Sequence, residues 1–122
     1  GAKKAKYHAA ASILSNQVIA VLDMGYSLLE DCGFTRAEAV RATGQLVMRN
    51  IENVLEAGCD GALTGPIERN DIETVKKHIA CMQNDDSDDV RLYKMLGTKL
   101  VNIAEKKNPD KDYTQMMELL RG

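Results

Sequence analysis

The hydrophobic residues of this chain recur with the spacing of amphipathic α-helices, and no segment alternates apolar and polar residues as a β-strand does. The first apolar segment predicts one helix from about Ala5 to Cys32, which Gly33 ends. Apolar residues cover nearly every side of this segment, and a helix that is apolar all round is normally buried all round. Such a helix is roughly 40 Å long, whereas a compact domain of this size is roughly 35 Å across. We therefore expect a partner chain or domain to help cover it.

Capping residues mark the next two predicted helices. Thr35 and Glu38 form a capping-box pattern that starts the second helix, and Gly58 stops it. The third helix begins near Asn70 or Asp71. The dozen residues between these two helices have no helical periodicity, and long ordered loops in small domains often carry function.

Two more helices complete the pattern. An acidic segment, residues 84–89, is expected to be a solvated turn that caps a fourth helix running from about Asp88 to Lys107. A short fifth helix is capped at Asp112. We therefore predict an all-α fold, with residues 1–122 forming a single domain: a five-helix bundle with one long buried N-terminal helix.

Composition argues against several classes of function. The net charge is −2, Trp is absent and Phe occurs once, so we expect neither a nucleic-acid interface nor attraction to an anionic membrane. The longest uncharged run, residues 9–22, is too short and too polar to predict a membrane span. Three cysteines without a CxxC pair are poor evidence for a disulfide framework, and we expect reduced thiols in a cytoplasmic protein.

The sequence also lacks the patterns that bind common cofactors. The two histidines lie far apart along the chain, so no metal site is predicted. Neither a GxGxxG turn nor a Walker loop occurs, so no cofactor is expected to bind to this chain by itself.

A polar stripe in the otherwise apolar first helix is one candidate for chemistry. His8, Ser12 and Asn16 are spaced i, i+4 and i+8, which places them on one face of an α-helix. Burying His or Asn costs free energy unless each is hydrogen-bonded. The three side chains therefore either hydrogen-bond to one another or to neighbouring backbone groups, face solvent, or form a binding surface.

The long loop before the third helix is the second candidate. The Gly65 and Pro66 pair indicates a tight turn after Thr64, and Asp71 is a natural helix cap. Arg69 can pair with Asp71 or bind an anion. The alternative interpretation is an ordinary helix connection with ordinary capping.

The same two segments resemble a known family. Residues 7–11 (Tyr-His-Ala-Ala-Ala), followed by residues 15–16 (Ser-Asn), resemble the opening helix of the C-terminal domain of uncharacterised Rossmann-like proteins. Residues 63–67 (Leu-Thr-Gly-Pro-Ile), followed by Arg69 and Asp71, resemble the signature loop of that family. Its members join an NAD(P)-type Rossmann domain to a C-terminal helical domain of unknown function. That helical domain is similar to the dimerisation domains of pyrroline-5-carboxylate reductase and 6-phosphogluconate dehydrogenase. The resemblance covers essentially the whole chain, but only the C-terminal half of a typical member.

The resemblance implies a role for the chain and for its polar residues. It implies that the chain is the C-terminal dimerisation and substrate-pocket domain of an NAD(P)-dependent oxidoreductase. Such a domain is not catalytic alone, forms a homodimer and works with the Rossmann domain of its parent protein, which this chain lacks. His8 would transfer a proton, because the ordinary pKa of histidine lies near neutrality. The residues implied to bind substrate are Ser12, Asn16, Thr64, Arg69 and Asp71.

One residue departs from the family pattern. The family's loop usually carries Gly at the position of Asn70, and Asn tolerates left-handed backbone better than most residues, so the turn is expected to persist. A second function stays open from the sequence: a non-enzymatic helical association module, or a domain of a protein that senses a dinucleotide without catalysis.

Overall fold

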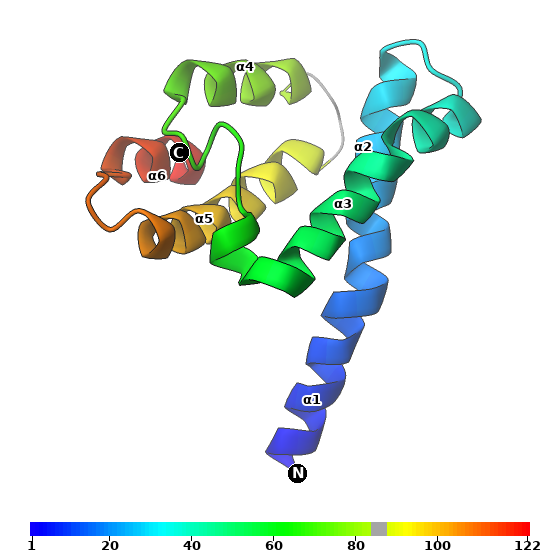
Figure 1. Cartoon of the computed structure of the whole chain (residues 1–122). Helices are drawn as coiled ribbons and strands as arrows, with labels where there is room; N and C mark the ends of the chain where they lie inside the picture. The colour runs from blue at the N-terminus through cyan, green and yellow to red at the C-terminus, as the bar shows by residue number, and fades with distance from the viewer. Residues whose placement is uncertain (84–87) are drawn as a thin grey trace. The chain divides into compact units, whose positions relative to one another are not determined.

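The computed structural model describes residues 1–83 and 88–122 (Figure 1). Within these ranges the secondary structure is helical, with five helices and no strand, which confirms the predicted all-α fold. Residues 84–87, the core of the predicted acidic turn, lie outside the described residues. The chain divides into two compact units, Gly1–Val47 and Met48–Gly122. The assignment of the chain to one functional domain stays a prediction.

The first helix runs through three consecutive segments. They are α1 (Ala2–Ser12), a π-helical segment η1 (Ile13–Gln17) and α2 (Val18–Asp31), and Figure 1 draws them as one continuous rod. The backbone turns away at Gly33, which has a φ of 101°. The helix thus matches the predicted length and stop, whereas its π-helical segment was not predicted.

The first helix is not buried by its own chain. None of its residues is buried, and the exposed fractions of Leu14 and Ile19 reach 78% and 65%. The prediction of a buried N-terminal helix is therefore wrong for the single chain. The reason is geometric: within the unit Gly1–Val47 only the start of one other helix is available, and one neighbour covers only one side of a helix.

The length and apolar composition of residues Ala2–Asp31 would also allow a membrane span. Core helices of soluble proteins and signal sequences pass the same test, so this property is weak evidence for a membrane location.

The second helix, α3 (Arg36–Ala62), begins at the predicted capping box. The backbone N–H of Thr35 donates to Glu38 Oε1 at 2.9 Å, and the N–H of Glu38 donates to Thr35 Oγ1 at 3.1 Å. Gly58, the predicted stop, breaks the helical backbone with φ 77° and ψ 174°. A further turn follows the break, so α3 ends four residues later than predicted.

A charged cluster fixes the turn between α2 and α3 within the first unit. The Arg36 guanidinium contacts Asp23 Oδ1 at 2.9 Å and Glu30 Oε1 at 2.8 Å. It also lies 5.6 Å from the centre of the Tyr26 ring, a cation–π distance. The capping box and this cluster together define where α3 leaves the turn.

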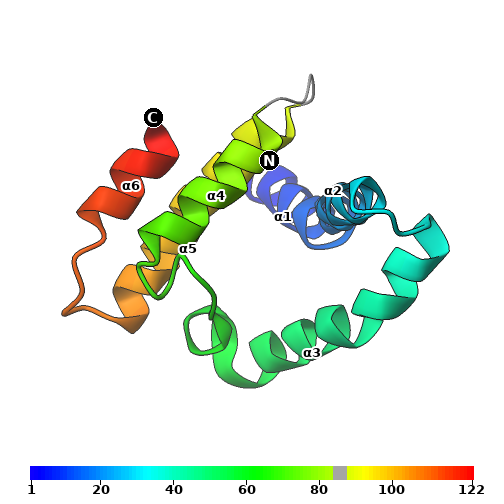
Figure 2. The ribbon, with the colours of Figure 1, turned by 90° about the horizontal axis from the view of Figure 1, so that it is seen from above.

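The second unit contains the main hydrophobic core. Its helices α4 (Ile72–Met82), α5 (Asp89–Lys107) and α6 (Thr114–Arg121) lie against one another in Figures 1 and 2. Their apolar faces meet in a cluster of buried residues: Ile67, Val75, Ile79, Val101, Ala104, Tyr113, Met116 and Leu120.

Local capping in the second unit follows the sequence closely. Asp71 caps α4 as predicted, and its carboxylate accepts the backbone N–H of Thr74 at 3.2 Å. The Asp112 carboxylate accepts the N–H of Thr114 at 2.9 Å, so it stabilises the turn that leads into α6. Because α6 starts at Thr114, with Tyr113 at the capping position, Asp112 lies one residue earlier than a standard cap.

Candidate functional site

The predicted polar stripe lies where α1 meets η1, and it is accessible to solvent. His8 and Asn16 are exposed and Ser12 is half-buried. Among the described residues, no hydrogen bond reaches the side chain of His8 or Asn16. The structure therefore excludes the alternative in which the side chains of His8 and Asn16 are buried in their own chain and hydrogen-bonded there.

The π-helical segment adds a residue that the sequence analysis missed. Ser12 Oγ donates to Gln17 Oε1 at 3.1 Å, across five residues, and Ser15 Oγ donates to the carbonyl of Ala11 at 2.6 Å. Residues five apart lie close together on a π-turn, whereas the α-helical spacing used for the stripe pairs residues four apart. Gln17 thus belongs with the stripe. No sequence signal identified it, because the α-helical periodicity continues through η1.

The predicted loop runs from the end of α3 to the cap of α4. Gly65 and Asn70 both have positive φ angles, 99° and 59°. Asn70 thus adopts the left-handed backbone expected of it, and its Nδ2 donates to the carbonyl of Asp112 at 2.9 Å. The buried side chain of Ile67 holds the middle of the loop against the core.

Replacing Asn70 tests this turn. Asn70→Ala is expected to destabilise the chain by about 1–2 kcal/mol, because Ala carries the full steric cost of left-handed backbone. It also removes the hydrogen bond to Asp112. Asn70→Gly removes the same bond but carries no steric cost in left-handed backbone. It is the matched control, with a smaller loss of unfolding free energy. Urea unfolding followed by circular dichroism measures both. Equal losses for the two variants would contradict a role for the left-handed backbone.

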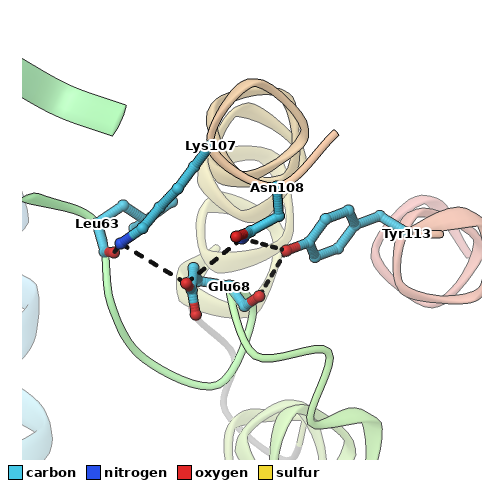
Figure 3. Close-up of polar contacts among 5 residues, drawn as sticks. All are labelled: Leu63, Glu68, Lys107, Asn108 and Tyr113. Atoms are coloured by element: carbon cyan, nitrogen blue, oxygen red, sulfur yellow. Dashed lines mark hydrogen bonds and ion pairs between the residues drawn. The ribbon is translucent and has the colours of Figure 1, made fainter. Parts of the chain in front are cut away.

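Five residues that the sequence analysis did not single out as a group hold this loop to α5 and the start of α6 (Figure 3). Lys107 Nζ donates to the carbonyl of Leu63 at 2.7 Å and lies 3.6 Å from Glu68 Oε1. Tyr113 Oη donates to the carbonyl of Glu68 at 2.6 Å and accepts Asn108 Nδ2 at 3.0 Å. We call these residues the loop anchor. Its partners are about 40 residues apart in sequence, so no local pattern indicates it.

The three predicted loop residues have different surroundings. Thr64 and Arg69 are exposed, and neither side chain forms a hydrogen bond or close ion pair within the described residues. Asp71 is engaged in capping, since Thr74 Oγ1 also donates to its Oδ2 at 2.7 Å. The hydroxyl and then the backbone N–H of Thr74 lower the pKa of Asp71, and the charge of Arg69 lowers it further.

The lowered pKa of Asp71 predicts a pH dependence. A carboxyl group whose pKa is lower in the folded state stabilises the fold above its unfolded pKa of about 4. That stabilisation is lost as the pH falls through the folded pKa. Asp71→Asn is therefore expected to reduce the fall in stability between about pH 4 and pH 2. Unfolding curves at several pH values measure this. Asp110→Asn is a control, since the exposed Asp110 side chain forms no hydrogen bond within the described residues. An unchanged slope in Asp71→Asn would refute the prediction.

The members of each predicted group lie within one compact unit of the chain. Thr64, Arg69 and Asp71 lie on one anchored loop in the unit Met48–Gly122. His8, Ser12 and Asn16 lie on the first helix, in the unit Gly1–Val47. A joint site made from both groups stays a prediction. Within the ranges that the structure describes, no group of three or more His, Cys, Asp or Glu side chains could hold a metal ion.

The described part of the chain is an all-α protein with an exposed apolar helix and an anchored loop. A family model described as a domain of unknown function, DUF2520, matches residues 1–100, and the chain belongs to this family. No curated protein and no solved structure matches the chain.

Proposed function

We propose that this chain is the C-terminal dimerisation and substrate-pocket domain of an NAD(P)-dependent oxidoreductase and is not catalytic alone. The observation that carries the dimerisation part of the proposal is the exposed apolar surface of the first helix. Monomeric soluble proteins rarely expose contiguous apolar patches larger than a few hundred Å². Here the unit Gly1–Val47 exposes large apolar side chains on the first helix and at the start of α3: Tyr7, Ile13, Leu14, Val18, Ile19, Val21, Val40 and Leu46.

A second copy of the chain is the proposed cover for this surface. In a two-fold symmetric dimer the same surface of each copy faces the other, so one self-complementary apolar helix is sufficient. Obligate dimers commonly bury more than about 2,000 Å² in total, and more apolar surface than transient complexes do. A continuous helix of 30 residues offers a surface of the right length for such an interface.

The oxidoreductase part of the proposal rests on the resemblance and on the exposed polar residues beside the apolar surface. His8 is assigned proton transfer, and Ser12 and Asn16 are assigned hydrogen bonds to a substrate oxygen. The Arg69 side chain forms no hydrogen bond or close ion pair within the described residues and can bind a carboxylate or phosphate, with Thr64 and Asp71 in the same loop. This chain has no glycine-rich turn for a pyrophosphate, so we assign the nucleotide to the Rossmann domain of the parent protein.

Light scattering of the 122-residue chain at micromolar concentration tests the dimer. The expected mass is twice 13.4 kDa. A sample that shows only the 13.4 kDa species would contradict the proposal. Sedimentation with phosphatidylcholine vesicles is run in parallel. Quantitative binding of the chain to vesicles would assign the apolar helix to a membrane, and would also contradict the proposed dimer.

The reading frame upstream of Gly1 tests the oxidoreductase assignment separately. A strand followed by GxGxxG there supports an oxidoreductase. Its absence would favour the second candidate, a non-enzymatic association module, which the same exposed helix supports equally.

Calorimetric titration of this chain with NADP is expected to show no binding, and a micromolar dissociation constant would overturn the assignment of the nucleotide to another domain.

A further inference from the structure

A small pocket opens beside Thr64 in the unit Met48–Gly122. Its volume is about 220 Å³. The last turns of α3, the first residues of the loop and the middle of α5 line it, and the loop anchor holds its loop wall through Leu63, whose carbonyl accepts Lys107 Nζ. The apolar part of the lining consists of Val54, Ala62, Leu63, Leu100 and Ile103.

The polar part of the lining is neutral. It consists of the Asn50 amide, the Cys59 thiol and the Thr64 hydroxyl, and none of the lining residues in the described part of the chain is charged. Within the described residues, the side chains of Asn50 and Thr64 form no hydrogen bond, so their donors and acceptors are available to a ligand. The lining offers no opposite charge to a charged group placed here, so the pocket does not favour ionic ligands.

We propose that this pocket binds the apolar part of a small neutral carbonyl compound, or of the corresponding alcohol. Thr64 and Asn50 hydrogen-bond to its oxygen. A dry cavity of about 150 Å³ in another protein holds benzene, so the present volume has room for about six carbon atoms and a polar group. The role of this ligand as substrate rests on the proposed function, because Thr64 is one of the predicted substrate-binding residues. Arg69, which is assigned a carboxylate or phosphate, does not line this pocket, so the pocket takes only the neutral part of a substrate. Binding itself does not depend on that role.

The test titrates 4-methylpentan-2-one into the methyl-labelled 122-residue chain and follows methyl NMR signals. We expect saturable shifts of the Leu100 and Ile103 methyl signals with a millimolar dissociation constant, as is usual for so small a ligand. Val21 and Leu29 line a separate small apolar pocket in the other unit, so their methyl signals are the internal control and should not move.

Two variants connect the binding to this pocket. Ala62→Leu fills the pocket and should weaken binding at least tenfold, while Ala57→Leu makes the same change on an exposed part of α3 outside the pocket and should not. Thr64→Val keeps the side-chain shape, removes the hydroxyl and should weaken binding about fivefold, the loss of one hydrogen bond.

Three results would overturn the proposal. The first is the absence of saturable shifts, or equal shifts in both apolar pockets. The second is equally tight binding of the anion 4-methylpentanoate. The third is binding that appears only on dilution to monomer, which would mean that a second copy of the chain fills the pocket. Light scattering reports on the dimer independently, so failure of the ligand proposal is distinguishable from failure of the proposed function.

Discussion

A chain with Ile19 replaced by aspartate is expected to be monomeric at concentrations where the parent chain is a dimer. Ile19 is 65% exposed in the single chain, so a charge there disturbs the monomer little. In a dimer that covers the first helix, the same carboxylate would be buried without a partner, at a cost of about 3–5 kcal/mol. That cost corresponds to a dimer at least about a hundredfold weaker.

Light scattering over a concentration series measures this shift, and circular dichroism checks that the helices persist. Gln115→Asp adds the same charge at an exposed position of α6, outside the apolar surface of the first helix, and should leave the dimer intact. Leu14→Asp, at a position 78% exposed in the single chain, is an independent second variant should Ile19→Asp not fold. A dimer of unchanged affinity in a folded variant would show that the first helix is not the interface.

Tyr113→Ala is expected to reduce the free energy of unfolding by about 3–5 kcal/mol, as other large aromatic-to-alanine changes in cores do. The Tyr113 side chain is only 2% exposed, and it belongs to the same core cluster as Met116. The substitution leaves a cavity there and also removes the hydroxyl from the loop anchor. The carbonyl of Glu68 and Nδ2 of Asn108 both lose this partner. Urea unfolding followed by circular dichroism measures the loss.

Tyr113→Phe separates the two contributions. It keeps the ring and removes only the hydroxyl, so the expected loss is about 1–3 kcal/mol. Thr64→Val is the control, because the exposed Thr64 hydroxyl forms no hydrogen bond within the described residues and surface changes of this kind stay within about 0.5 kcal/mol. If Tyr113→Phe were as stable as the parent chain, the hydroxyl would not contribute to the loop anchor. If Tyr113→Ala were neutral as well, the core would not depend on this ring.

The sequence by itself determined the features that depend on neighbours within about four residues. Thr35 and Glu38 cap each other across three residues, and Asp71 reaches the backbone of Thr74 over the same distance. The left-handed backbone of Asn70 is equally local, since it is governed by the side chain at that position. Helical periodicity is likewise a short-range pattern, so the all-α class and the number of helices could be predicted.

The tertiary structure alone decided which distant residues meet and which surfaces stay uncovered. The loop anchor joins Glu68 to Lys107 and Tyr113 across about 40 residues, and the fold of α5 and α6 determines that contact. The exposure of Ile19 depends on how few elements surround the first helix, whereas its apolar pattern indicated burial. The turn that follows Gly58 and the π-helical segment around Asn16 are small departures from regular backbone that the side-chain pattern does not encode. Long-range packing selects among arrangements that local interactions leave nearly equal in free energy.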